Sequence, residues 1–172
     1  MCDKKKSIFV TKESSCEIIN CEFLNLEGKA VFGKDKSKIL IKNTYFKNCR
    51  KGAVTIVNQS NLFIDTGVTI ESSQNASLRA INNSEIKAVN LIINKTNGNA
   101  INLKKSNGCF VNCDIKETTF PTVAIKGYGS NPKFENCNFN DNLNDFCVIC
   151  KDGCRPLFDH CNFLDCLKEN IS

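Results

Sequence analysis

The sequence contains no tryptophan, one histidine and only three arginines among its 172 residues. A nucleic-acid-binding domain usually carries a dense basic patch in which arginines make bidentate contacts. Arg50, Arg79 and Arg155, with a net charge of +5, fall short of such a patch. No apolar run approaches the roughly 18 residues that a membrane-spanning helix requires. We therefore expect neither nucleic-acid binding nor a membrane span.

A secretory leader is also missing from the sequence as it stands. The first residues, Met1 to Val10, include a run of lysines, and no apolar stretch of roughly 7–15 residues follows them. We therefore expect an intracellular protein whose cysteines are thiols. A domain excised from a longer chain would instead be compatible with secretion or surface display. The length predicts a single domain over residues 1–172.

Asparagine is strongly over-represented, with 24 residues, and its positions reveal a repeat. The segment Ile18-Ile-Asn-Cys-Glu-Phe23 recurs most clearly as Phe134-Glu-Asn-Cys-Asn-Phe139 and Phe158-Asp-His-Cys-Asn-Phe163. A fixed period of this length is typical of solenoid proteins. The anchor positions of successive copies lie 22 to 24 residues apart, at Asn20, Asn43, Thr66, Asn90, Asn112, Asn136 and His160.

Each repeat predicts three short strands. One ends two residues before the anchor, one spans positions +1 to +3, and one spans +11 to +13 with alternating apolar residues. The third copy fits only with a shift of one residue, to Leu78 and Ala80, which we ascribe to a bulge at Gly67. In the last long copy the pattern directs Cys147 and Ile149 inward. The prediction is an all-β fold, a single-stranded parallel β-helix of about seven coils of roughly 23 residues.

Stacked coils bring equivalent residues into columns. We expect asparagines at the anchors to accept left-handed backbone angles and to form a hydrogen-bonded ladder, with Thr66 and His160 as departures. One inward apolar column should contain Ile18, Ile41, Ile64, Ala88, Phe110, Phe134 and Phe158. A second should contain Phe23, Phe46, Ile70, Ile93, Ile115, Phe139 and Phe163.

Over essentially the whole chain the repeat resembles right-handed β-helix proteins of the pectin-lyase-like superfamily. The segments Phe23-Leu-Asn-Leu-Glu-Gly-Lys-Ala-Val31 and Phe46-Lys-Asn-Cys-Arg-Lys-Gly-Ala-Val54 are also similar to the repeats of polymorphic outer-membrane proteins. The resemblance implies a right-handed coil. It implies no single function, since enzymes, adhesins, phage spikes and scaffolds share this fold.

Sugar-cleaving enzymes of this superfamily bind substrate along the outer face of one sheet, where carboxylates hold Ca²⁺ or act as acid and base. Hydrolysis needs two facing carboxylates, and metal-assisted elimination needs an acidic cluster. Arg79 occupies the position of a lyase base, although a solvated strand residue is the simpler interpretation. We expect no catalytic residue and no enzyme, because the outward residues of the +11/+13 strands include no Asp or Glu: Phe9, Phe32, Thr55, Arg79, Asn102, Ala124 and Val148.

The twelve cysteines raise the question of a metal site. Cys147, Cys150, Cys154 and Cys166 have the only metal-like spacing, but zinc needs four converging ligands, and Cys147 should point inward. Packing thiols are the preferred interpretation, with disulfides or a metal as alternatives. The single histidine, His160, fills an anchor position, and a catalytic histidine needs a nucleophile or metal beside it. We expect no metal and no cofactor.

Six lysines follow the +13 position and should line one edge of the rod, beside exposed phenylalanines. Such an edge is either a solvated face or a surface for an acidic protein or a polyanionic glycan. We expect a non-enzymatic rod, a scaffold, fibre or assembly component that packs against other subunits or itself through its side and coil ends. A carbohydrate-active enzyme or a glycan-binding adhesin is the alternative. The interaction edge comprises Lys34, Lys36, Lys104, Lys105, Lys126, Lys151, Phe9 and Phe32.

Overall fold

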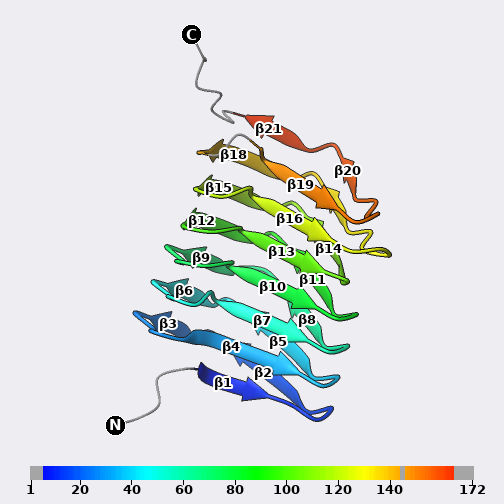
Figure 1. Cartoon of the computed structure of the whole chain (residues 1–172). Coiled ribbons are helices and arrows are strands. Elements are labelled where there is room, and N and C mark those ends of the chain that lie inside the picture. Colours follow the sequence, from blue (N-terminus) through cyan, green and yellow to red (C-terminus); the bar gives the residue numbers. More distant parts are fainter. Residues whose placement is uncertain (1–5, 144–145, 165–172) are drawn as a thin grey trace.

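The structure is a computed structural model and describes residues 6–143 and 146–164. The chain winds into coils that stack along one axis from the N-terminal to the C-terminal end (Figure 1). Each coil contributes one strand to each of three parallel sheets, so the predicted all-β parallel helix of about seven coils is confirmed. Among the described residues there is no helix with the length and apolarity needed to cross a membrane.

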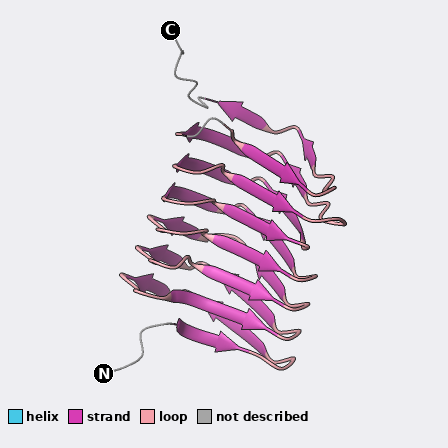
Figure 2. Cartoon of the chain, in the orientation of Figure 1, coloured by secondary structure: helices cyan, strands magenta, loops and turns pink. Residues whose placement is uncertain are grey.

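The three sheets each contain seven strands, drawn as arrows in Figure 2. Sheet A contains β1 (Lys6–Val10), β4 (Lys29–Lys34), β7 (Val54–Val57), β10 (Leu78–Ile81), β13 (Ile101–Lys104), β16 (Val123–Lys126) and β19 (Val148–Lys151). Sheet B contains β2 (Ser15–Ile19), β5 (Lys38–Lys42), β8 (Asn61–Ile64), β11 (Glu85–Val89), β14 (Asn107–Val111), β17 (Lys133–Glu135) and β20 (Leu157–Asp159). Sheet C contains β3 (Glu22–Leu24), β6 (Tyr45–Lys47), β9 (Thr69–Glu71), β12 (Ile92–Thr96), β15 (Asp114–Thr118), β18 (Asn138–Asn142) and β21 (Asn162–Leu164).

The core includes the two predicted apolar columns, which the strand register confirms, together with inward residues of sheet A such as Val54, Leu78 and Ile101. In sheet B, Phe110 pairs with Phe134 and Phe134 with Phe158, and the ring centroids lie 4.8 Å apart at both steps. In sheet C, Phe139 and Phe163 stack at 4.9 Å. These ring distances match the separation of about 4.8 Å between neighbouring strands, so the aromatic stacking follows directly from the coil spacing.

The anchor of the third coil is Gly67 and not Thr66, which corrects the prediction. The N–H of Asn20 donates to the carbonyl of Lys42, directly before the next anchor, and the N–H of Asn43 donates likewise to Thr66. Gly67 has the left-handed φ of 74° that this corner requires, and a β-branched threonine adopts such an angle poorly. Leu78 and Ala80 then lie at +11 and +13 without any bulge.

The last coil also differs by one residue from the prediction. Val148, and not Cys147, pairs with Val123, so Ile149 lies on the outer face of sheet A in the place predicted for Val148. Cys147 precedes the strand at the corner, where its Sγ lies 3.7 Å from the hydroxyl of Thr122. The extra residue of this coil falls between β18 and β19, a loop whose length the repeat does not constrain.

The six anchors other than Thr66 have the predicted left-handed φ, between 46° and 55°. Their side chains are not hydrogen-bonded to one another within the described residues. Asparagine side chains do form hydrogen bonds between coils at other turns. Asn48 donates to Asn25 at 2.7 Å, and Asn82 donates to Asn58 at 3.2 Å. At the third coil such a hydrogen bond is impossible, because Gly67 has no side chain to meet the Asn43 amide.

In five of the seven coils the residue after the anchor is a cysteine or threonine that caps backbone carbonyls at the corner between sheets B and C. In the other two coils the residue is the buried Val68 or Leu91. The thiol of Cys137 lies 3.4 Å from the carbonyl oxygens of both Phe110 and Glu135. Thr44, at the equivalent position of the second coil, donates its hydroxyl to the Lys42 carbonyl at 2.8 Å. A hydroxyl and a thiol make the same contact at equivalent positions of different coils. These cysteines therefore have a packing role, and this role explains their spacing.

A buried serine ladder runs along the corner between sheets A and B, and the sequence analysis missed it. From the second serine of the ladder onward, each hydroxyl accepts a hydrogen bond at 3.2 Å from the backbone N–H of the serine one coil earlier. These side chains are at most 2% exposed. The signal was present, because the serines recur with the period of the anchors: Ser37, Ser60, Ser84, Ser106 and Ser130.

Removing one rung of this ladder should destabilise the fold. Ser84 accepts from the Ser60 N–H and donates to the Ile81 carbonyl at 2.8 Å, so Ser84→Ala leaves a buried N–H unsatisfied. We expect a loss of about 1–3 kcal/mol in the free energy of unfolding, measured by urea denaturation. The exposed Ser15 provides the control, and a comparable loss in Ser15→Ala would contradict the ladder's role.

Substitution of the third anchor tests the corrected register. A Cβ at Gly67 would lie 2.3 Å from Oδ1 of Asn43, whereas a Cβ at Gly129 would have no atom within 4 Å. Both glycines have left-handed φ angles, 74° and 79°, which cost an alanine about 1–2 kcal/mol. Gly67→Ala should therefore lower the unfolding midpoint clearly more than Gly129→Ala, and equal losses would argue against the contact with Asn43.

The stability contributed by a buried thiol should depend on pH. Burial raises the pKa of the Cys49 thiol from 9.0 to about 11, so the folded chain retains this proton after the unfolded chain has released it. The contribution is complete below the unfolded pKa and is lost as the pH rises toward the folded pKa. The stability difference between the natural chain and Cys49→Ala should narrow from about pH 8 to about pH 11. A constant difference in denaturation experiments would refute this linkage.

Candidate functional site

The outer face of sheet A carries a continuous column of residues in register along all seven strands. Phe9 is 49% exposed and its ring stacks on Phe32 at 5.7 Å. The ammonium groups of Lys34 and Lys29 lie 5.7 Å and 4.8 Å from the ring centroids of Phe9 and Phe32. Among the described residues this column has no carboxylate: it contains Phe9, Phe32, Thr55, Arg79, Asn102, Ala124 and Ile149.

The structure places the six predicted edge lysines at the corner between sheets A and B, in adjacent columns. Lys104, Lys126 and Lys151 are in register on neighbouring strands. Lys34 belongs to the same column, but Val57 and Ile81 separate it from the other three. Lys36 and Lys105 lie in the following turns, with left-handed φ angles of 61° and 48°. The strongest alignment of positive charge is therefore in the C-terminal half.

A groove of about 350 Å³ lies over β10, β13, β16 and β19 on this face, and we call it the sheet A groove. Pro121, Ala124, Ile125 and Ile149 provide its apolar part. Asn99 donates to the Pro121 carbonyl at 2.5 Å and accepts a hydrogen bond from Asn102 at 3.1 Å. The polar and charged lining consists of Arg79, Asn99, Asn102, Lys104, Lys126 and Lys151.

Arg79, which occupies the position expected for the base of a lyase, lies in this groove. No carboxylate that could assist elimination lines the groove beside it. The Nε of Arg79 is buried and has no hydrogen-bond partner in the described part of the chain. The groove lining contains no carboxylate that could act as an acid or hold a cation. The geometry therefore presents Arg79 as a binding group for an anion.

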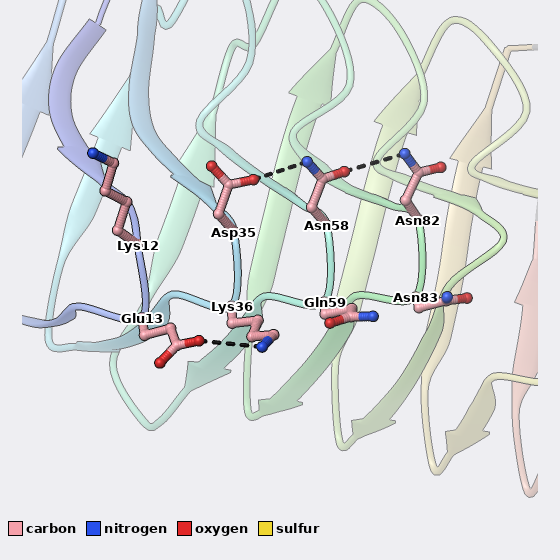
Figure 3. Close-up of a pocket in the computed structure, with 8 residues that line it drawn as sticks. All are labelled: Lys12, Glu13, Asp35, Lys36, Asn58, Gln59, Asn82 and Asn83. Atoms are coloured by element: carbon pink, nitrogen blue, oxygen red, sulfur yellow. Dashed lines mark hydrogen bonds and ion pairs between the residues drawn. The ribbon is translucent and has the colours of Figure 1, made fainter.

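A second, larger groove of about 620 Å³ crosses the turns between sheets A and B (Figure 3). Two neighbouring left-handed residues form each turn, and stacking the turns produces two parallel rows of side chains. One row consists of Lys12, Asp35, Asn58 and Asn82, and the other of Glu13, Lys36, Gln59 and Asn83.

The polar groups of this turn groove largely satisfy one another. Asn58 donates to Asp35 at 2.9 Å and accepts from Asn82 at 3.2 Å, while Lys36 pairs with Glu13 at 3.1 Å. The hydrogen bond from Asn58, with further contributions from Lys34, holds the pKa of the Asp35 carboxyl below its ordinary value. Although the turn groove is larger than the sheet A groove, it is the weaker candidate for binding a charged ligand, because its own charges are already balanced.

Of the cysteine candidates for a metal site, Cys150 and Cys154 lie within hydrogen-bond reach of each other, but the described residues bring no third ligand to them. Cys147 lies at the corner against Thr122, Cys150 is exposed on β19, and Cys154 lies in the following turn. Cys166 lies outside the described residues. No group of three His, Cys, Asp or Glu side chains suited to a metal occurs in 6–143 and 146–164.

The single histidine lies at the anchor of the last coil. Nδ1 of His160 is 2.7 Å from a carboxylate oxygen of Asp159, and its side chain is 82% exposed. Its φ of 50° is that of the other anchors. The position is therefore explained by the turn that it forms.

Comparison with known proteins agrees with this architecture. A family model described as "Right handed beta helix region" matches residues 3–109 and 66–172. No curated protein matches the chain. Among solved structures, trypsin-treated QnrB1, a plasmid-mediated fluoroquinolone resistance protein, is 8% identical over 83% of this chain and 90% of that chain. Its TM-score of 0.17 supports no inference. The family match, which spans nearly the whole chain, shows that the protein belongs to the right-handed β-helix family.

Proposed function

We propose that the protein is a non-enzymatic interaction module, a rigid β-helical rod that binds other macromolecules along the outer face of sheet A. The observation that carries this proposal is the composition of that face. It combines a stacked aromatic pair, the exposed Phe9 and the half-buried Phe32, with a cationic groove and contains no carboxylate in its described central column. Exposed apolar surface beside charge is typical of an interface.

The fold supports a scaffold role because it fixes each outward side chain relative to its neighbours. Every strand of sheet A between β1 and β19 is hydrogen-bonded to strands on both sides. The inward columns and the serine ladder hold the coils in one register. A binding surface on such a rod is preorganised, so little conformational entropy is lost when a partner binds.

A carbohydrate-active β-helix enzyme is the competing proposal, and Arg79 is the observation that favours it. Elimination from an acidic sugar needs a base together with groups that stabilise the substrate carboxylate, and cations in the groove could supply the latter. Hydrolysis needs two carboxylates facing the glycosidic bond. Because the groove lining contains no Asp or Glu, binding without cleavage is the better supported function.

Cleavage assays test this proposal directly. We expect no new reducing ends and no ultraviolet absorbance of an unsaturated product when the chain is incubated with pectin, polygalacturonate or alginate. The physical reason is that the groove offers neither an acid–base pair nor an acidic metal site.

A control variant identifies the source of any activity that appears. Turnover that Arg79→Ala abolishes would overturn the proposal in favour of the lyase alternative. Turnover that survives in Arg79→Ala would place catalysis elsewhere on the rod and would equally contradict a non-enzymatic role.

A further inference from the structure

The sheet A groove has an unbalanced row of positive charge. Lys104, Lys126 and Lys151 are directly opposite one another on β13, β16 and β19. Like charges in register on adjacent strands destabilise a sheet. Lys126 is paired with Asp152 at 3.5 Å, whereas Lys104 and Lys151 form no ion pair within the described residues. An anionic ligand would remove this repulsion.

Arg79 adds a cation whose hydrogen-bonding capacity is not used. It lies in the same groove, and its buried Nε has no partner in the described part of the chain. A guanidinium group binds carboxylates through two parallel hydrogen bonds more effectively than an ammonium group does. The groove therefore selects for carboxylates, with one fork-shaped donor and three flexible ones.

The apolar part of the groove indicates that the ligand is not uniformly charged. Pro121, Ala124 and Ile149 line the groove. Phe120, directly before Pro121 in the chain, is 53% exposed. Burial of such a surface stabilises a complex only when the ligand also carries apolar groups.

The amides of the groove argue against a sugar polymer. Hydroxyl groups of a glycan need acceptors as well as donors, but Oδ1 of Asn99 already accepts a hydrogen bond from Asn102. One N–H of each of the two Nδ2 groups is also engaged within the groove, with Pro121 and Asn99 as the acceptors. With no carboxylate in the lining, the side-chain acceptors are the two amide oxygens alone. The N–H donors of Arg79 and the three lysines outnumber them, and a carboxylate needs donors alone.

We propose that the sheet A groove binds an acidic segment of a partner protein, in which carboxylate side chains alternate with apolar ones. The carboxylates pair with Arg79 and the lysine row, and the apolar side chains cover Ala124, Ile149 and Pro121. This inference rests on the proposed function as an interaction module and adds the site and the chemistry of its partner.

Fluorescence anisotropy on the full chain tests the inference with three probes. These are a fluorescein-labelled peptide of alternating Asp and Leu that is long enough to cross the four strands, a matching Asp and Ser peptide, and labelled polygalacturonate. We expect the Asp–Leu peptide to bind most tightly and its affinity to fall as salt is raised. The triple variant Lys104→Gln, Lys126→Gln, Lys151→Gln should weaken binding about tenfold or more.

A matched control removes the same charge from exposed positions outside sheet A. The triple variant Lys38→Gln, Lys51→Gln, Lys87→Gln should change the affinity less than about twofold. Circular dichroism verifies the fold of each variant, and the single variants Arg79→Gln and Lys104→Gln provide the same test if a triple variant does not fold.

Each remaining outcome rejects the inference. These outcomes are no binding of the Asp–Leu peptide, equal weakening in both triple variants, or tighter binding of polygalacturonate than of either peptide. Cleavage of polygalacturonate in the same samples would refute the non-enzymatic function itself, so failure of the inference and failure of the proposed function are distinguishable.

Discussion

Parallel hydrogen bonding between successive coils is the constraint on which the rest of the structure depends. It fixes neighbouring strands about 4.8 Å apart and brings each residue against the one that lies 22 to 25 positions away. Each residue must therefore fit the equivalent residues of the adjacent coils as well as its neighbours in the chain. This explains why aromatic rings stack at 4.8–4.9 Å in both inward columns. It also explains why a side chain at Gly67 would collide with Asn43 of the preceding coil.

Columns of identical residues have opposite consequences on the two faces of a sheet. Inward, stacked phenylalanines and stacked serines gain packing and hydrogen bonds from being alike. Outward, aligned lysines repel one another, as at Lys104, Lys126 and Lys151. The repeat therefore accounts for the core without accounting for the lysine row, and a departure from local stability of this kind often marks a functional surface.

The sequence allowed the fold to be predicted because the anchors and the two apolar columns repeat with one period. One error in the predicted register arose where the residue type expected at a position disagreed with the backbone angle found there. Thr66 resembled an anchor by position, but the left-handed φ belongs to Gly67. The register of β19 could not be derived from the repeat, because the loop before it has an additional residue. The serine ladder was periodic in the sequence and was overlooked because serine is usually assigned to exposed turns.

The groove could not be predicted in the same way, since it depends on how columns from different coils combine across the sheet. The expected lysine edge treated six residues as equivalent, whereas the register separates Lys34 from the aligned row and places Lys36 beside Glu13. Equally, nothing in the sequence shows that the Asn99 and Asn102 amides bond to each other. That pairing matters because it engages one of the few acceptors in a groove whose other polar groups are mainly cationic donors. On a rod whose coils differ little in backbone, such differences between outward columns are where a specific function can reside.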